Sequence, residues 1–359
     1  MTCPLSTITW NDFQELGLSE KAKLLQESGR EFHVMFAQQF TRKRLDELGA
    51  LATVIRRMAK SRDGRRFLGQ CLAHQRAMLY FTQPSSRTFL SFCAACQILG
   101  MQIGEVRDPA VSSEFKGETR EDSVRTFSSY FDLIIMRTEL SGLVERMSWV
   151  LSQSERPVPI VNAGSGKDQH PTQALLDIYT LQRSFEDRGG IDGKTIMFVG
   201  DLARGRTVRS LSILLTTYKN VRQIFVAPES LQVGDDILVQ LSAAGTDYEI
   251  SSDFRKSIPE ADAIYMTRVQ HEWDVKGETS EDSIADYSFT TEHLKLLSPD
   301  SVLMHPFPRK GEISPDVDHD PRAVYWRQMR NGMWIRAALI ASMFRCDDGI
   351  TAESQSIGK

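Results

Sequence analysis

A turn rich in hydroxyl groups follows an apolar run in the first quarter of the chain. The run 77–81 predicts a buried strand, and Ser85, Ser86, Arg87 and Thr88 come soon after it, where the next periodic segment predicts the start of a helix. The first backbone N–H groups of a helix lack partners and carry positive partial charge, and an arginine fork fits phosphate oxygens. These residue types are also ordinary N-caps, but together they predict a site for a phosphate-bearing small molecule.

Polar residues follow several other predicted strands at the same topological position. They are Arg137 after 133–136, His170 and Gln173 after 159–161, Arg206 after 195–199, Arg268 and Gln270 after 263–266, and His305 and Arg309, on either side of Pro306 and Phe307, after 302–304. A single cluster of this kind would be interpreted as structural. Several clusters at the same position predict a ligand site, because parallel strands bring all of their carboxyl ends to one edge of the sheet, where ligands bind. The pattern therefore predicts two binding edges, one on each of two sheets.

Composition excludes several classes of protein. The formal net charge is -4, so no global basic field attracts nucleic acid, and any anion must be held by local arginines. No run of about 18 apolar residues predicts a membrane span. Residues 1–16 lack the features of a signal peptide. We expect no nucleic-acid partner and no membrane partner.

The cysteines predict neither a metal centre nor a disulfide framework. The five cysteines are scattered, and Cys93 and Cys96 alone have a C-x-x-C spacing, with no second pair after them. They fall in the helix expected after the phosphate turn, which favours two buried thiols on one helical face. Scattered cysteines of this kind fit a protein in a reducing cytoplasm.

Strands alternate with helices along the chain, which indicates an α/β fold. Predicted strands cover 77–81, 101–106, 133–136, 159–161, 195–199, 223–226, 247–250, 263–266 and 302–304. Helical patterns separate them, which implies two doubly wound parallel-sheet domains. The break falls near the helix that begins at His170, and a long C-terminal helix is expected to return to the first domain.

The ordered motifs resemble those of aspartate carbamoyltransferase catalytic chains, within the aspartate/ornithine carbamoyltransferase superfamily. The matching motifs are 84–88, 116–119, 136–137, 162–164 with 170–173, 199–202 with 205–208, 265–270 and 305–309. They stand in family order and span 42–343. The resemblance implies transfer of a carbamoyl group from carbamoyl phosphate to L-aspartate in pyrimidine biosynthesis, with no cofactor and no metal.

The resemblance also names the domains. They are an N-terminal extension at 1–35, a carbamoyl phosphate-binding domain at 36–170 completed by the C-terminal helix at 322–346, an aspartate-binding domain at 171–321, and a disordered tail at 347–359.

Roles for the site residues follow from the same resemblance. Ser85, Ser86, Arg87 and Thr88 would bind phosphate, and Arg137, His170 and Thr88 would polarise the carbonyl oxygen. Gln173 and the backbone carbonyls near Pro306 and Phe307 would bind the carbamoyl amide, and Arg206 and Arg268, with Gln270, would bind the aspartate carboxylates. No strong general base is evident, so catalysis would depend on positioning and charge stabilisation.

A charged loop implies shared active sites. In the family, the loop equivalent to 116–119 reaches the neighbouring subunit, so Lys116 and Ser112 would complete a site in a homotrimer. Regulatory chains and a dihydroorotase are candidate partners. The segment 276–283 nearly repeats 116–123, but the similarity does not extend into the flanks, and we interpret it as a solvent-exposed loop.

Three departures from the family pattern concern the site. Phe89 stands where many members have an arginine, Glu114 adds a negative charge near the ligand loop, and Phe307 replaces a usual leucine. We expect Phe89 to change local packing, Glu114 to weaken anion binding, and Phe307 to be tolerated, with a cis bond to Pro308 as in the family.

Two other functions compete with this one. A carbamoyltransferase acting on ornithine or a derivative would carry His-Cys-Leu-Pro at the proline loop, which is absent here, and Arg268 would repel an ornithine ammonium. A catalytically silent structural or regulatory paralogue would be expected to lose its anion-binding residues, and these are retained.

Overall fold

The computed structural model describes residues 4–108, 117–166, 169–268 and 287–357. The chain divides into two compact units. Unit 1 comprises Met1–Leu175 and Gly332–Lys359, and unit 2 comprises Leu176–Asn331.

Unit 1 contains a parallel sheet with the strand order β4-β3-β5-β6. Its strands are β3 (Arg76–Phe81), β4 (Gln102–Val106), β5 (Leu133–Thr138) and β6 (Ile160–Ser165). The chain moves outward from β3 to β4 and then crosses back to β5 on the other side of β3. The direction of winding therefore reverses between β3 and β5, which is where doubly wound sheets bind ligands.

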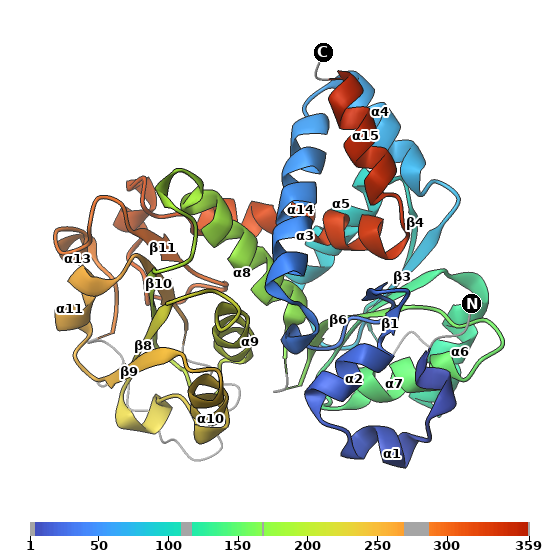
Figure 1. The fold of residues 1–359 in the computed structure, drawn as a ribbon, viewed down its shortest axis with the longest axis horizontal. Coiled ribbons are helices and arrows are strands. Elements are labelled where there is room, and N and C mark those ends of the chain that lie inside the picture. The colour runs from blue at the N-terminus through green and yellow to red at the C-terminus, as the bar shows by residue number, and fades with distance from the viewer. Residues whose placement is uncertain (1–3, 109–116, 167–168, 269–286, 358–359) are drawn as a thin grey trace. The chain divides into compact units, whose positions relative to one another are not determined.

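Helices cover both faces of this sheet (Figure 1). They are α3 (Arg42–Met58), α4 (Arg62–Cys71), α5 (Ser86–Ile98), α6 (Arg120–Tyr130), α7 (Leu143–Ser152) and the first turn of α8 (Pro171–Ser184). On one face, Met78, Tyr80, Ile134 and Met136 form a core with α6 and α7. The helix α5 contacts β3 and β4 from the opposite face. The alternation of side chains along each strand produces these two layers.

The N-terminal segment belongs to unit 1. It forms a 3-10 turn, two helices, a small hairpin and a second 3-10 turn, which are η1 (Pro4–Thr7), α1 (Trp10–Glu15), α2 (Leu18–Leu24), β1 (Gln26–Glu27), β2 (Arg30–Glu31) and η2 (Ala37–Gln39). Leu5, Phe13 and Leu25 are fully buried in the core beside α7. The segment therefore covers one face of the sheet.

The C-terminal helices also belong to unit 1. Most of α14 (Tyr325–Met343) and all of α15 (Asp347–Ile357) lie within it. The return of the C-terminal helix to the first domain is confirmed. The expectation of a disordered tail from residue 347 is wrong, because Ile350 is fully buried and α15 packs on α3 and α4. Few apolar residues in a polar segment gave little sequence signal for this packing.

Unit 2 contains a second parallel sheet, with the strand order β11-β10-β7-β8-β9. Its strands are β7 (Thr195–Val199), β8 (Arg222–Val226), β9 (Asp247–Ser251), β10 (Ala263–Met266) and β11 (Val302–Met304). Here the winding reverses between β7 and β10. Both sheets are parallel and doubly wound, so the predicted α/β fold class is confirmed.

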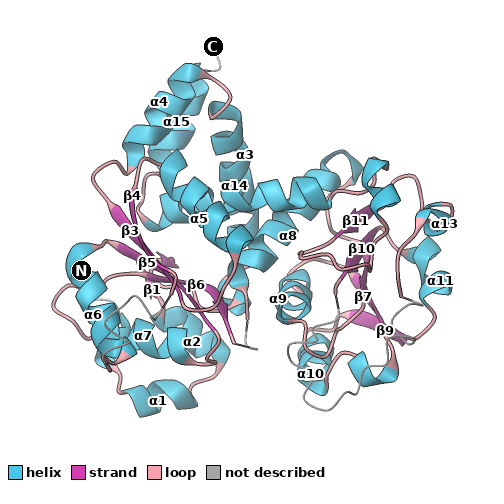
Figure 2. Ribbon diagram, turned by 180° about the vertical axis from the view of Figure 1, so that it is seen from behind, coloured by secondary structure: helices cyan, strands magenta, loops and turns pink. Residues whose placement is uncertain are grey.

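Helices flank this sheet on both faces as well (Figure 2). They are α9 (Arg206–Leu215), α10 (Asp235–Ala243), α11 (Phe254–Ser257) and α13 (Thr291–Leu294), with short 3-10 turns η5 (Glu186–Arg188), η6 (Glu229–Leu231), η7 (Ile258–Glu260) and η9 (Pro315–His319). The helices α9 and α10 lie on one side, and α11 and α13 on the other. Within the described residues, no helix has the length and apolarity that a membrane crossing requires.

A buried histidine joins the N-terminal segment to the sheet of unit 1. His33 is fully buried. Its Nδ1 accepts a hydrogen bond from the Ile160 backbone N–H at 3.0 Å, so Nε2 carries the proton and donates to Ser152 Oγ at 2.8 Å. Burial lowers the pKa of His33 to about 3. The ring is therefore neutral at every pH at which the protein is expected to fold.

We expect this histidine to make the protein sensitive to acid. The folded-state pKa lies below the ordinary value of 6.5, so its contribution to stability is complete above about pH 6.5 and is lost as the pH falls toward 3. Between these two pH values, protonation of this histidine in the unfolded chain raises the unfolding equilibrium constant about tenfold for each unit by which the pH falls. Urea unfolding of His33→Gln should show a shallower pH dependence than the wild type. His74→Gln, at an exposed position, is the matched control and should not change the slope.

Candidate active site

The hydroxyl-rich turn after β3 lies at the N-terminus of α5. Ser85 is the N-cap residue and has an extended backbone, but its side chain makes no capping hydrogen bond. Ser86 and Arg87 are exposed, whereas Thr88 is buried. The N–H groups of the first helical turn have no intrahelical partner, and positive partial charge gathers there. The turn thus has the donors that an anion requires.

Arg137 is the penultimate residue of β5, directly beside this turn. It is the register partner of Phe81, the last residue of β3, so it lies at the point where the winding of the sheet reverses. Its side chain is 8% exposed, and Nη1 donates to the Ala163 carbonyl at 3.0 Å. The Arg137 carbonyl accepts from the Thr82 backbone N–H at 2.9 Å. These bonds fix a cation at the carboxyl edge of the sheet.

His170 and Gln173 reach the same edge from the start of α8. The carbonyl of His170 accepts from the Gln173 N–H at 2.9 Å, which closes the first turn of the helix. Both side chains are buried, with exposed fractions of 4% and 8%. Gly166, in the preceding turn, has a φ of +42°, and a Cβ there would lie 2.3 Å from Ser141 Oγ. Only glycine allows this close approach.

Arg336 of α14 connects the two helices that carry these residues. Its exposed fraction is 3%, and its guanidinium donates to Ser91 Oγ on α5 at 2.6 Å and to Thr172 Oγ1 on α8 at 3.5 Å. It also lies 4.7 Å from the ring centroid of Phe92. Our sequence analysis missed this residue, although a lone charge within the apolar run 333–341 was a usable signal.

Arg206 and Arg268, two predicted site residues of unit 2, both follow strands at the carboxyl edge of its sheet. Arg206 is the first residue of α9, after β7, and Arg268 follows β10. Both side chains are half-buried. Gly200, with a φ of +112°, ends β7 so close to β10 that a Cβ would lie 2.3 Å from the Thr267 carbonyl oxygen. The winding reverses here too, so two arginines flank the position where a ligand is expected.

A buried polar chain holds the proline loop after β11. Asp177 accepts from Tyr265 Oη at 2.8 Å and from Gln328 Nε2 at 2.7 Å, and Gln328 Oε1 accepts from the His305 N–H at 2.8 Å. Nδ1 of His305 in turn accepts from the Phe307 backbone N–H at 2.8 Å. The backbone of the loop is therefore fixed. Sequence reasoning missed Asp177 and Gln328, because their partners are distant in the chain.

The other side of the His305 ring contacts a carboxylate. Nε2 donates to Glu312 Oε1 at 2.5 Å. Burial would raise the pKa of Glu312, but the hydrogen bond from His305 and those from the backbone N–H groups of Glu312 and Lys310 outweigh it and lower that pKa. The bond to Pro308 is cis, as the resemblance implied, and Phe307 has a φ of +58°. Phe307 itself packs on Trp326 with ring centroids 5.0 Å apart.

Three predicted site residues, Ser112, Lys116 and Gln270, lie outside the described residues. So do Glu114 and the segment 276–283. The chain after Lys116 is well anchored: Thr119 caps α6, and Arg120 donates to Glu139 at 3.0 Å. At the departure from the family pattern, the Phe89 ring is buried and meets Phe81 edge to face at 5.4 Å.

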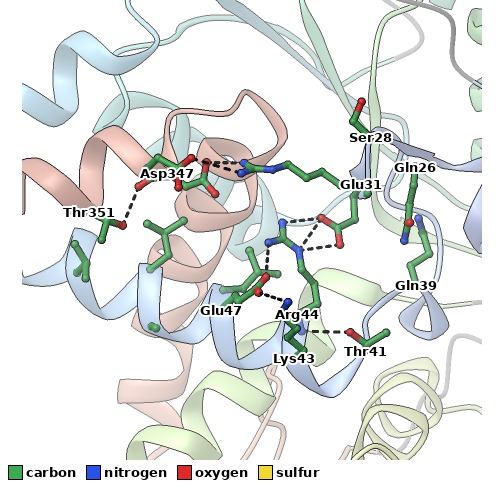
Figure 3. Close-up of a pocket in the computed structure, with 17 residues that line it drawn as sticks. Gln26, Ser28, Glu31, Gln39, Thr41, Lys43, Arg44, Glu47, Asp347 and Thr351 are labelled. Atoms are coloured by element: carbon green, nitrogen blue, oxygen red, sulfur yellow. Dashed lines mark hydrogen bonds and ion pairs between the residues drawn. The ribbon is translucent and has the colours of Figure 1, made fainter.

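A cavity of about 710 Å³ in unit 1 is lined by none of the predicted site residues (Figure 3). It lies among the β1–β2 hairpin, α3 and α15. Its charges pair with one another: Arg44 Nη2 lies 2.8 Å from Glu31, and Arg30 lies 2.6 Å from Asp347. Figure 3 shows Arg44 between Glu31 and Glu47. We interpret this cluster as the attachment of α15. Among the described residues, no group of His, Cys, Asp or Glu side chains is arranged to hold a metal ion.

Family models match both halves of the chain. The model described as "Aspartate/ornithine carbamoyltransferase, carbamoyl-P binding domain" matches residues 33–183, and the one described as "Asp/Orn binding domain" matches residues 192–343. The chain belongs to the aspartate/ornithine carbamoyltransferase family. The carbamoyl-P model covers the strands of unit 1 and the hydroxyl-rich turn at the N-terminus of α5. The Asp/Orn model covers the sheet of unit 2 with Arg206 and Arg268.

Individual relatives agree with this assignment. Aspartate carbamoyltransferase 1, chloroplastic, of Pisum sativum is 38% identical over 94% of this chain and 89% of its own length. The aspartate carbamoyltransferase catalytic subunit of Vibrio cholerae serotype O1 is 42% identical over 76% of this chain and 86% of its own length. A structure of aspartate transcarbamoylase from Trypanosoma cruzi in complex with N-(phosphonacetyl)-L-aspartic acid is 36% identical, with a TM-score of 0.77. That similarity covers 87% of this chain and 95% of the other.

The comparisons overturn the expected cytoplasmic location. The relatives from Pisum sativum, Oryza sativa and Arabidopsis thaliana are named chloroplastic. The expectation used the scattered cysteines, but unpaired thiols fit any reducing compartment and cannot select one.

We expect Arg336→Met to damage both the stability and the geometry of the site. The substitution keeps an apolar stem but removes two hydrogen bonds of a buried cation, and should lower the free energy of unfolding by about 3 kcal/mol. Arg336→Lys should recover part of that loss. Arg330→Met, an exposed position on the same helix, is the control. Equal unfolding midpoints for Arg336→Met and Arg330→Met would contradict a positioning role.

Proposed function

We propose that this chain is an aspartate carbamoyltransferase, which transfers the carbamoyl group of carbamoyl phosphate to the amino group of L-aspartate. The products are N-carbamoyl-L-aspartate and phosphate, in pyrimidine biosynthesis. The observation that carries the proposal is the position of two features of unit 1, the hydroxyl-rich turn at the N-terminus of α5 and Arg137. They lie on either side of the point between β3 and β5 where the winding of the sheet reverses. The T. cruzi relative, which is solved with a phosphonate analogue of both substrates, supports it.

Carbamoyl phosphate would bind at the edge of unit 1. Ser85, Ser86, Arg87 and the helix N-terminus would hold the phosphate, with Ser112 and Lys116 as further ligands. Gln173 and the backbone carbonyls of Pro306 and Phe307 would accept hydrogen bonds from the carbamoyl amide. The buried polar chain behind His305 supports this last role, because it fixes the backbone of the proline loop.

Arg137, His170 and Thr88 would surround the carbonyl oxygen. All three side chains are buried, so their donors are oriented before the reaction begins. When the aspartate amine attacks the carbonyl carbon, negative charge develops on that oxygen, and fixed donors in a site that excludes water stabilise it. The bond from carbon to the phosphate oxygen then breaks. The leaving phosphate would take the proton that the amine loses.

Aspartate would bind at the edge of unit 2. Arg206 and Arg268 would each contact one carboxylate, and Gln270 would steady Arg268 or the ligand. A planar guanidinium suits a carboxylate because it can form two parallel hydrogen bonds. The same arginines disfavour ornithine, whose side-chain ammonium would face a cation. The description of the matched domain covers both aspartate and ornithine, and Arg206 and Arg268 favour aspartate as the substrate.

We expect the purified protein to form carbamoylaspartate and no citrulline when it receives carbamoyl phosphate with aspartate or ornithine. Arg87→Ala should lower kcat by about 100-fold or more, because it removes a cation that would hold the phosphate, the leaving group of the reaction. Arg66→Ala, an exposed arginine on α4, should keep wild-type activity. A panel of amino acids in a steady-state assay measures both effects. Citrulline as the main product, or normal turnover by Arg87→Ala, would refute the assignment.

The family resemblance also supports a homotrimer with shared sites, in which Lys116 serves the site of a neighbouring subunit. Regulatory chains or a dihydroorotase are further candidate partners. The anchored exit of the loop at Thr119 and Arg120 supports this role, since a loop that donates a ligand must be held at its base.

Mixed trimers provide a test of shared sites. Lys116→Ala and His170→Ala proteins should each be inactive alone. After mixing, dissociation and reassembly, about a quarter of wild-type activity or less should return, because some sites then receive both native residues. The activity of the mixture is measured against each variant treated in the same way. If no activity returns although trimers form, each site is built from one chain.

A further inference from the structure

A carboxylate lies beside the hydroxyl-rich turn that we propose as the phosphate site. Glu139 is exposed and directly follows β5, two residues after Arg137. The Thr82 hydroxyl donates to Glu139 Oε2 at 3.3 Å, and Thr82 directly follows β3, three residues before Ser85. A negative charge at this place repels an anionic ligand unless a cation compensates it. Glu139 would therefore weaken phosphate binding if it were left without a cationic partner.

Arg120, the first residue of α6, supplies the compensating cation. Its Nη2 donates to Glu139 Oε1 at 3.0 Å, and its Nη1 donates to Thr138 Oγ1 at 3.4 Å. Partial burial would raise the pKa of Glu139, but hydrogen bonds from its own backbone N–H, from Arg120 and from Thr82 outweigh it and lower that pKa. Glu139 is therefore ionised and paired at neutral pH.

The pair joins three segments at the carboxyl edge of the sheet, namely the residue after β3, the end of β5 and the start of α6. Each segment is also fixed through its main chain or a cap. The Thr82 backbone N–H donates to the Arg137 carbonyl at 2.9 Å, and the Thr119 side chain caps α6. An exposed ion pair adds little to stability, so its main consequence here is the relative position of the three segments.

We propose that Glu139 is a positioning residue for carbamoyl phosphate, which acts with Arg120 to hold the turn between β3 and α5 in the conformation that binds the phosphate group. This inference rests on the proposed function, because it concerns the first substrate of that reaction. Glu139 would not contact the phosphate itself, since two anions repel each other. The sequence analysis missed both residues, because only the fold brings the start of α6 to the end of β5.

A purely electrostatic role for the two residues predicts a different pattern. If Glu139 acted only as a charge near the anion, its neutralisation would strengthen phosphate binding, whereas neutralisation of Arg120 would weaken it. If the pair positions the turn, either neutralisation weakens binding. The double variant differs as well, because two opposite through-space effects cancel, whereas the loss of one shared contact counts once.

The experiment compares the steady-state kinetics of full-length variants with those of the wild type. Glu139→Gln and Arg120→Gln should each raise the KM for carbamoyl phosphate about threefold to fivefold, with kcat and the KM for aspartate unchanged. The double variant should show the rise of the larger single variant and not the product of the two. Calorimetric titration with inorganic phosphate should give the same ratios for its Kd.

Glu155→Gln and Arg125→Gln are the matched controls, because both residues are exposed and belong to the same unit. Neither control should change the KM for carbamoyl phosphate. All of the variants should keep the thermal midpoint of the wild type, since an exposed ion pair contributes little to stability. A change in this KM at a constant thermal midpoint separates positioning of the turn from a general loss of structure.

Several outcomes overturn the positioning role. They are a lower KM for carbamoyl phosphate in Glu139→Gln, an unchanged KM in both single variants, and a double variant that returns to the wild-type value. If the wild type forms no carbamoylaspartate, the proposed function fails, and the titration with inorganic phosphate still decides whether the pair positions the turn. A wild-type protein that binds no phosphate overturns both.

Discussion

In each sheet the chain reverses its direction of winding once, between β3 and β5 in unit 1 and between β7 and β10 in unit 2. At that point the connections leave the carboxyl edge toward opposite faces, so no crossover fills the space between the two strand ends. Parallel strands bring every carboxyl end to this edge. The whole arrangement of predicted ligand groups depends on this one constraint, since it places Arg137 beside the turn after Phe81.

Buried polar groups behind the two edges determine how well the ligand groups are positioned. Arg336 bonds to both α5 and α8, and Asp177, Gln328 and His305 form a continuous chain to the proline loop. Buried polar atoms are costly unless each finds a partner, so such networks have few alternative arrangements. The same property makes them sensitive to single substitutions.

The electrostatics of the protein are local. The net charge is -4, yet the residues at both edges include several arginines and a helix N-terminus. A protein of negative net charge can attract small dianions only through such concentrated positive groups, because screening removes the effect of charges beyond about 10 Å. The acidic side chains that balance them are largely engaged elsewhere, as Glu31 and Asp347 are around the cavity of unit 1.

The sequence by itself determined the strands, the helix starts and the family, because apolar periodicity, cap residues and ordered motifs are local signals. It placed Ser85 at the start of α5 and Arg206 at the start of α9, as the structure has them. Tertiary structure alone decided that Arg336 links α5 to α8, that Ile350 is buried where α15 packs, and that Asp177 and Gln328 join the proline loop. These contacts join residues far apart in the chain, and no local pattern encodes which distant surfaces will pack together.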